Sequence, residues 1–183
     1  MLARFFAPLP ALILSFFMVL NLPATSSPAL AEVALAGDGI VKVNSAHGFD
    51  ETIEILKKDI SSKGIMFFMA VDQTKLGDNA GIKLAPSTLL IFGNPPLGIQ
   101  FLTANPNAGL DWPVRLLVTQ DDKGQVWAVY TDFEWIKRRH GITNRDDAFK
   151  MASSVITSIT SSVAAKLLRR RPYLQRALGR VCS

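Results

Sequence analysis

The chain has 183 residues, with 20 lysines and arginines against 15 aspartates and glutamates, and a formal net charge of +5 at pH 7. Five arginines near the C-terminus equal that whole excess, so the rest of the chain is close to neutral. They are Arg169, Arg170, Arg171, Arg176 and Arg180. The basic charge therefore describes a C-terminal extension and says little about what the folded domain binds. The single cysteine, Cys182, excludes an intramolecular disulfide, and we expect it to be an inert residue of that extension.

Residues 1–31 have the pattern of a secretory signal peptide. Arg4 lies near the amino terminus, residues 5–20 are apolar and uncharged, and Ala29-Leu-Ala31 is a small-x-small cleavage motif. An uncleaved anchor is the alternative, but the apolar run is shorter than the ~20 residues of a spanning helix and contains two prolines. We expect an exported protein, periplasmic or extracellular, that begins at Glu32 and is the size of one domain.

The first half of the mature chain contains strand and helix patterns in alternation. Residues 39–44 alternate apolar and polar side chains, which predicts a half-buried strand. A helix is predicted from Phe49, because apolar residues recur every three or four positions up to Ile60 and Gly64 can cap its end. Residues 65–71 form a continuous apolar run and predict a buried strand, and residues 72–81 predict a short helix or a loop.

The second half begins with a strongly apolar strand at residues 88–92, and Pro95 is well placed to open a helix. Residues 114–119 and 126–130 alternate around a Gly-containing turn, which predicts a hairpin. Helical patterns follow from Phe133, and Thr143-Asn-Arg-Asp146 predicts a capping box for a longer last helix. This order of elements predicts an α+β fold, with helices packed on a mainly antiparallel sheet.

Several short segments carry a resemblance to a known family. They are Phe49-Asp-Glu-Thr, Phe92-Gly-Asn-Pro, Leu110-Asp-Trp-Pro-Val-Arg, Lys123-Gly-Gln-Val-Trp and the stretch from Trp135 to Gly141. Through these segments, residues 39–163 resemble one copy of the domain-of-unknown-function family 302. This family is found mostly in bacteria and archaea. The resemblance implies a compact α+β domain that pairs into homodimers, and it implies no catalytic residue. Residues 164–183 then form the basic extension.

Motifs for metal, phosphate and nucleophile chemistry are missing from the sequence. His47 and His140 lack a metal-ligand spacing, so we expect surface or capping roles, although either could still serve as a haem or metal ligand. Prolines in Gly93-Asn-Pro-Pro-Leu-Gly98 remove donors that a phosphate loop would use, and no nucleophile elbow exists. No cofactor is evident, and enzymatic activity is not favoured.

One group of residues suits ligand binding, because its members fall at strand ends or on neighbouring predicted strands. The group is Asn94, Asp111, Trp112, Arg115 and Tyr130. Arg115 would need a counter-charge if buried, which either Asp111 or a bound anion could supply. The alternatives are therefore a structural ion pair or an anion site. Phe92 and Trp127 are expected in the core.

These observations lead to a main hypothesis and two alternatives. The main one is an exported, non-enzymatic binding or interaction module that forms a homodimer. The first alternative is an enzyme or redox accessory with a shallow polar site around Asn94, Arg115 and Tyr130. The second is a peripheral membrane protein, in which the C-terminal arginines meet anionic headgroups and the interleaved leucines enter the interface. Export argues against a nucleic-acid partner.

Overall fold

The computed structural model describes residues 37–165. The predicted signal peptide and the five C-terminal arginines lie outside the described residues. The strands are β1 (Ile40–Asn44), β2 (Met66–Asp72), β3 (Ser87–Gly93), β4 (Val114–Gln120) and β5 (Val126–Thr131). The helices are α1 (Phe49–Ser62), α2 (Gln73–Asn79), α3 (Pro95–Ala104), α4 (Phe133–Arg139) and α5 (Asp146–Ser161), with a 3₁₀ helix η1 (Pro106–Leu110).

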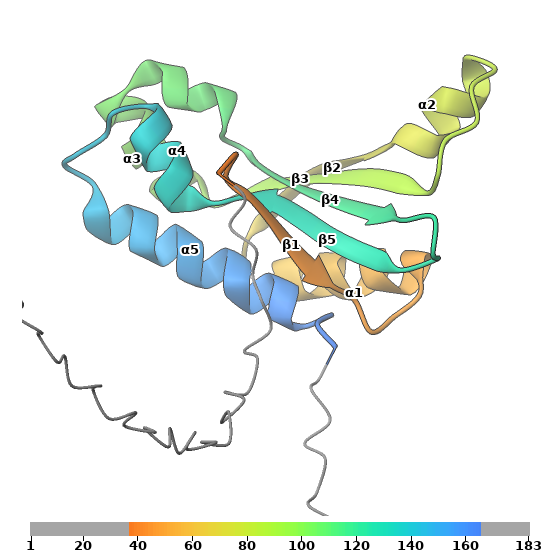
Figure 1. Ribbon diagram of the computed structural model, residues 1–183. Coiled ribbons are helices and arrows are strands. Elements are labelled where there is room, and N and C mark those ends of the chain that lie inside the picture. Colours follow the sequence, from red (N-terminus) through yellow and green to blue (C-terminus); the bar gives the residue numbers. More distant parts are fainter. Residues whose placement is uncertain (1–36, 166–183) are drawn as a thin grey trace, which may run out of the picture. The chain divides into compact units, whose positions relative to one another are not determined.

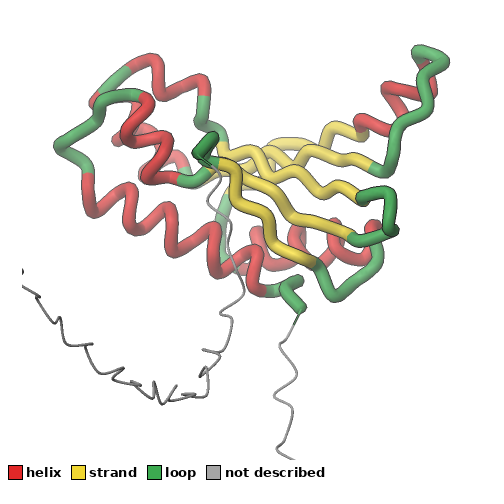
Figure 2. Tube along the Cα trace, viewed as in Figure 1, coloured by secondary structure: helices red, strands yellow, loops and turns green. Residues whose placement is uncertain are grey.

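The strands form one sheet in the order β1-β5-β4-β3-β2, and every neighbouring pair is antiparallel. Figure 1 shows α1 and α5 on the same face of this sheet, with α3 and α4 at one end of it. The hairpin of β2 and β3 extends to the opposite end, where it carries α2 (Figure 2). The predicted α+β fold with a mainly antiparallel sheet is confirmed.

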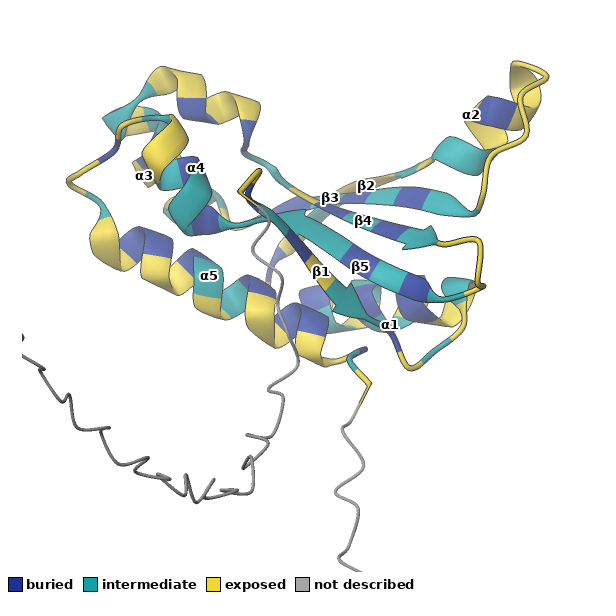
Figure 3. Ribbon diagram, viewed as in Figure 1, coloured by how far each residue is buried: buried dark blue, intermediate teal, exposed yellow. Residues whose placement is uncertain are grey.

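The core lies between the sheet and the two long helices. On the covered face, alternate strand residues such as Leu90, Leu116 and Val118 are fully buried (Figure 3). The helices contribute one side chain per turn to the same cluster: Ile53, Leu56 and Ile60 from α1, and Phe149, Ala152, Ile156 and Ile159 from α5. Buried side chains thus recur every two residues along the strands and about every 3.6 residues along the helices, and the two sets pack against each other.

No helix among residues 37–165 covers the opposite face of the sheet. One row across that face runs through all five strands in register: Val71, Leu89, Leu117, Val129 and Lys42. None of these five side chains is buried, although four are apolar. The sheet therefore has one packed face and one open, largely apolar face.

Residues 65–71 were predicted to form a buried strand, and the predicted burial is wrong. The strand exists as β2, but it lies at the edge of the sheet, and none of its residues is buried. Met66, Phe68 and Met69 are among the most exposed large apolar side chains of the described domain. A continuous apolar run predicts a strand but does not say how many neighbours it has.

Two local predictions also need correction. The last helix has Arg145 as its N-cap residue and no side-chain cap, so the Thr143 capping box does not form. Trp127 was expected in the core, but it lies on the open face, where its indole N–H donates to Asp121 Oδ2 at 2.9 Å. This hydrogen bond, followed by those from the backbone N–H groups of Gln125 and Lys123, lowers the pKa of Asp121. The indole N–H thus stabilises the turn between β4 and β5.

Candidate functional site

The five predicted site residues occupy three different places. Asp111 and Arg115 meet in a cluster of ionic groups at the start of β4. Asn94 and Trp112 line a cavity at the end of β3. Tyr130 lies on β5, opposite Leu116 on the covered face of the sheet. The structure therefore does not gather all five around a single ligand.

Asp111 is the centre of the ionic cluster. It follows η1, and its side chain is only 2% exposed. Arg115 Nη2 donates to Oδ1 at 2.9 Å, Arg139 Nη1 donates to Oδ2 at 3.1 Å, and His140 Nε2 lies 2.7 Å from Oδ2. The Trp112–Pro113 peptide between Asp111 and Arg115 is cis. Three basic side chains from two elements therefore share one buried carboxylate.

The ion pair expected between Asp111 and Arg115 is present, but the expected burial of Arg115 is not. Its side chain is 47% exposed, so the buried partner is the aspartate. Because Asp111 is paired with both guanidinium groups and with His140, the geometry fits a structural ion cluster and gives little room for an added anion. The space beside Asp111 and Arg115 has a volume of about 10 Å³.

Sequence reasoning missed Arg139 and the burial of His140. His140 is the C-cap residue of α4, as a capping role would require, but its side chain is 5% exposed, and Asn105 Nδ2 donates to its carbonyl oxygen at 2.8 Å. Arg139 also stacks over Trp135, 5.4 Å from the ring centroid. The run of basic residues in the last turn of α4 was the available signal. Such a run is favourable at the end of any helix, so by itself it does not indicate an ion cluster.

Tyr130 is separated from Arg115 by the sheet itself. Arg115 precedes Leu116 on β4, and Leu116 pairs with Tyr130, so the arginine and the tyrosine project from opposite faces. Desolvation raises the pKa of Tyr130 above its usual value, with Thr157 of α5 acting in the opposite direction. The shallow polar site expected around Asn94, Arg115 and Tyr130 is not assembled.

The cavity has a volume of about 380 Å³ and lies between α3, α5 and the end of β3. Most of its lining is apolar, with Phe92, Leu97, Phe101, Trp112, Val114, Phe133 and Val155 among the contributors. Asn94 shapes its edge as the N-cap of α3, since its side chain accepts the Leu97 N–H at 3.3 Å. A volume in this range and an apolar lining are typical of small-molecule sites.

Glycine at position 98 makes this arrangement of the tryptophan possible. A Cβ built on Gly98 of α3 would lie 2.0 Å from the indole ring of Trp112, which is far inside van der Waals contact. Gly93, at the end of β3, faces the same ring, where a Cβ would lie 3.1 Å from Nε1. The two glycines hence bring Trp112 against the backbone of α3 and β3.

Within residues 37–165, no group of three or more His, Cys, Asp and Glu side chains is arranged to hold a metal ion. The imidazole of His47 faces Glu51, 3.0 Å from Oε1, and that of His140 faces Asp111. In the same range, no helix combines the length and the apolarity that a membrane crossing requires.

Comparison with known proteins places this fold in a family. Residues 41–159 match the model of "Domain of unknown function DUF302". A crystal structure of an uncharacterized conserved protein DUF302 from Bacillus stearothermophilus has a TM-score of 0.63 and 17% identity, over 68% of this chain and 98% of that one.

Curated relatives carry another name. Proteins named fluoride-specific ion channel FluC 1, from Brucella suis biovar 1, and FluC 2, from Brucella melitensis biotype 1, are each 33% identical over 132 residues. The match covers 72% of this chain but 52% and 49% of those proteins, so the chain spans about half the length of the curated relatives it matches. With its family model matched across the folded domain, the chain belongs to the DUF302 family.

Proposed function

We propose that the chain is an exported, non-enzymatic binding module that acts as a homodimer. The observation that carries the proposal is the uneven distribution of exposed apolar side chains. Of the nine large apolar residues that are exposed among residues 37–165, six lie between residues 66 and 84, in β2 and around α2. They are Met66, Phe68, Met69, Leu76, Ile82 and Leu84. Such a concentration on a soluble domain marks an interaction surface.

A second copy of the chain is the partner that this surface fits best. β2 is an edge strand without lysine or proline, two of the features that usually protect an edge from pairing, and its register with β3 shifts between Phe67 and Met69. Two β2 strands related by a two-fold axis would run antiparallel, with Met69 of one copy near Met69 of the other. This pairing satisfies the free backbone groups of both edges and covers the same apolar side chains twice. A self-complementary patch of this kind is characteristic of two-fold dimers.

We expect Met69→Lys to convert the dimer to a monomer, because a charged side chain at the two-fold axis would meet its own copy. Sedimentation equilibrium of the mature protein measures this directly. The matched control is Met151→Lys on α5, because Met151 is 58% exposed, close to the 53% of Met69, but lies on a helix of the covered face. A dimer that survives Met69→Lys, or a wild-type protein that is monomeric at all concentrations, would refute the proposal.

Association with a membrane surface is a second candidate, and the curated relatives favour it. An ion channel must span the bilayer, whereas the helices of residues 37–165 are not suited to that task. We infer that this domain corresponds to a part of the FluC proteins other than the channel, and that it works close to a membrane. The five C-terminal arginines can supply the contact, at ~1 kcal/mol for each one near an anionic surface.

Deletion of the residues after Leu168 is expected to abolish binding to vesicles that contain phosphatidylserine and to leave the fold unchanged. The full-length protein should bind these vesicles at low salt and dissociate from them at high salt, because salt screens the attraction between the arginines and the anionic headgroups. Vesicle sedimentation measures both, with phosphatidylcholine vesicles as the neutral control. Equal binding by the two proteins, or no binding by the full-length chain at low salt, would contradict this role.

A further inference from the structure

We propose that the cavity beside Trp112 is a binding site for an uncharged, largely apolar small molecule with a carbonyl group. This inference is independent of the proposed dimer. The cavity volume of about 380 Å³ corresponds to about a dozen water-sized groups, since a water occupies about 30 Å³ in the liquid. Its lining comes from five separate parts of the chain, including α3, α5, the end of β3 and the short segment between α1 and β2.

The indole N–H of Trp112 is the first reason to expect a hydrogen-bond acceptor in the ligand. An indole N–H only donates, and the Trp112 N–H makes no hydrogen bond with another described residue. In the part of the chain that the structure describes, Ser153 Oγ is the one completely buried side-chain polar atom without a partner, so the unpaired Trp112 nitrogen is not completely buried. Its neighbours Gly93 and Gly98 both line the cavity. A carbonyl oxygen placed there would complete the hydrogen bond.

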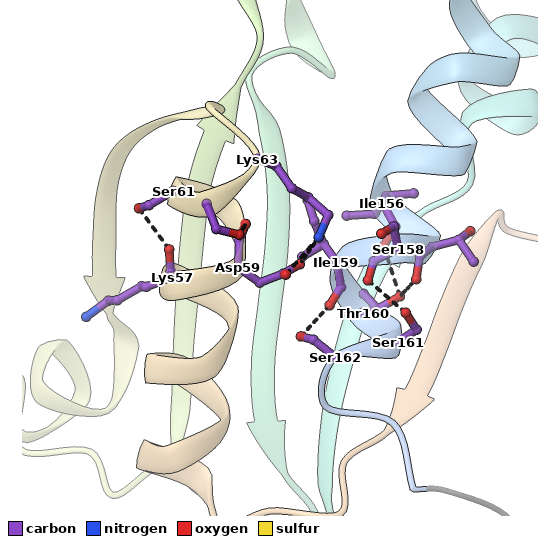
Figure 4. Close-up of polar contacts among 12 residues, drawn as sticks. Lys57, Asp59, Ser61, Lys63, Ile156, Ser158, Ile159, Thr160, Ser161 and Ser162 are labelled. Carbon is purple, nitrogen blue, oxygen red and sulfur yellow. Dashed lines mark hydrogen bonds and ion pairs between the residues drawn. The ribbon is translucent and has the colours of Figure 1, made fainter.

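The charges at the cavity are the second reason, because they exclude a strongly charged ligand. Of the described residues that line it, none is acidic and one is basic, namely Lys63. Figure 4 shows the ammonium of Lys63 held by Asp59, between α1 and α5. The two distances from Nζ to the carboxylate oxygens are 2.7 and 2.8 Å. The pair is neutral as a whole, and a ligand carboxylate would have to compete with Asp59 for the ammonium of Lys63.

The remaining polar groups of the lining are also compatible with a neutral acceptor. Ser154 and Ser158 of α5 are exposed and carry hydroxyl groups that can donate as well as accept. The exposed Met151, on the same helix, gives the cavity a flexible apolar rim. A ligand can therefore enter at the α5 side with its apolar body against Phe92, Leu97 and Phe101, and its carbonyl toward Trp112.

Nuclear magnetic resonance titration with 2-nonanone tests the position of the ligand. The indole N–H signal of Trp112 should shift and saturate, whereas the signals of Trp127 and Trp135 serve as internal controls. Trp127 is a suitable control because its N–H already donates to Asp121. Absence of binding up to the solubility limit of the ketone, or binding that leaves the Trp112 signal unchanged, would overturn the proposal.

Isothermal titration calorimetry then tests the chemical class. We expect nonanoate to bind at least fivefold more weakly than 2-nonanone, since the carboxylate meets the neutral Lys63–Asp59 pair. Equal or tighter binding of nonanoate would overturn the uncharged class. Trp112→Phe should weaken the ketone about three- to tenfold, the effect of one hydrogen bond. Unchanged affinity in this variant would show that the indole N–H does not bind the carbonyl.

A second variant keeps the test valid if Trp112→Phe does not fold. Val155→Phe adds volume at a half-buried position of the lining and should reduce ketone binding at least tenfold, with its fold checked by circular dichroism. Full binding by a folded Val155→Phe protein would place the ligand elsewhere and overturn the proposal.

Discussion

Replacement of Asp111 by Ala is expected to lower the free energy of unfolding by about 3–5 kcal/mol, because it removes the buried carboxylate that three basic side chains share and leaves the buried His140 without a partner. The carboxylate is almost completely buried and is shared by Arg115, Arg139 and His140. Without it, His140 stays buried with no partner for Nε2, and the two guanidinium groups lose their shared counter-charge. Chemical denaturation with urea, monitored by circular dichroism, measures the loss.

Arg115→Ala is the matched comparison, and its expected effect is much smaller. Arg115 is half-exposed, and after its removal Asp111 still has Arg139 and His140 as partners. A loss of about 1 kcal/mol is therefore reasonable, as for other partly exposed ion pairs. If Asp111→Ala costs no more than Arg115→Ala, the cluster is not held together by the buried carboxylate, and the argument from its geometry is wrong.

The ion cluster also shows how far the sequence alone could lead to the site. Asp111 and Arg115 are four residues apart on either side of a Trp-Pro turn, so their pairing could be expected from local spacing. Arg139 and His140 come from α4, more than twenty residues later, and only the docking of α4 beside η1 brings them to Asp111. No local pattern contains that information. For the same reason, the cavity beside Trp112 could not be predicted, because distant segments form its wall.

The secondary structure was more predictable than the burial. The signals that worked are local: the apolar spacing in α1, Pro95 at the start of α3, and the turn between β4 and β5. Burial depends on the order of the strands in the sheet, and this spatial order cannot be read from the order of the strands along the chain. β2 and β3 both contain continuous apolar runs, yet β3 has neighbours on both sides and β2 on one. The open face of the sheet was missed for the same reason.

Leu90→Ala is expected to lower the free energy of unfolding by about 2–5 kcal/mol, as is typical for a leucine removed from a closed core. Leu90 is fully buried on the central part of β3, where it belongs to the cluster that includes Leu56 of α1 and Leu116 of β4. The cavity left by this change faces two helices, so the surrounding structure has little freedom to fill it. Urea denaturation at low protein concentration measures the loss.

Ile91→Ala, one residue further along the same strand, separates the two faces of the sheet. The apolar run of residues 88–92 does not by itself distinguish Ile91 from Leu90. In the structure it lies on the open face, half-buried and opposite Met69 of β2 and Arg115 of β4. We expect a loss of about 1 kcal/mol in the monomer, the typical effect of a single substitution. An equal loss for Leu90→Ala and Ile91→Ala at low concentration would mean that the second face is covered within one chain, and the sheet would have no open face.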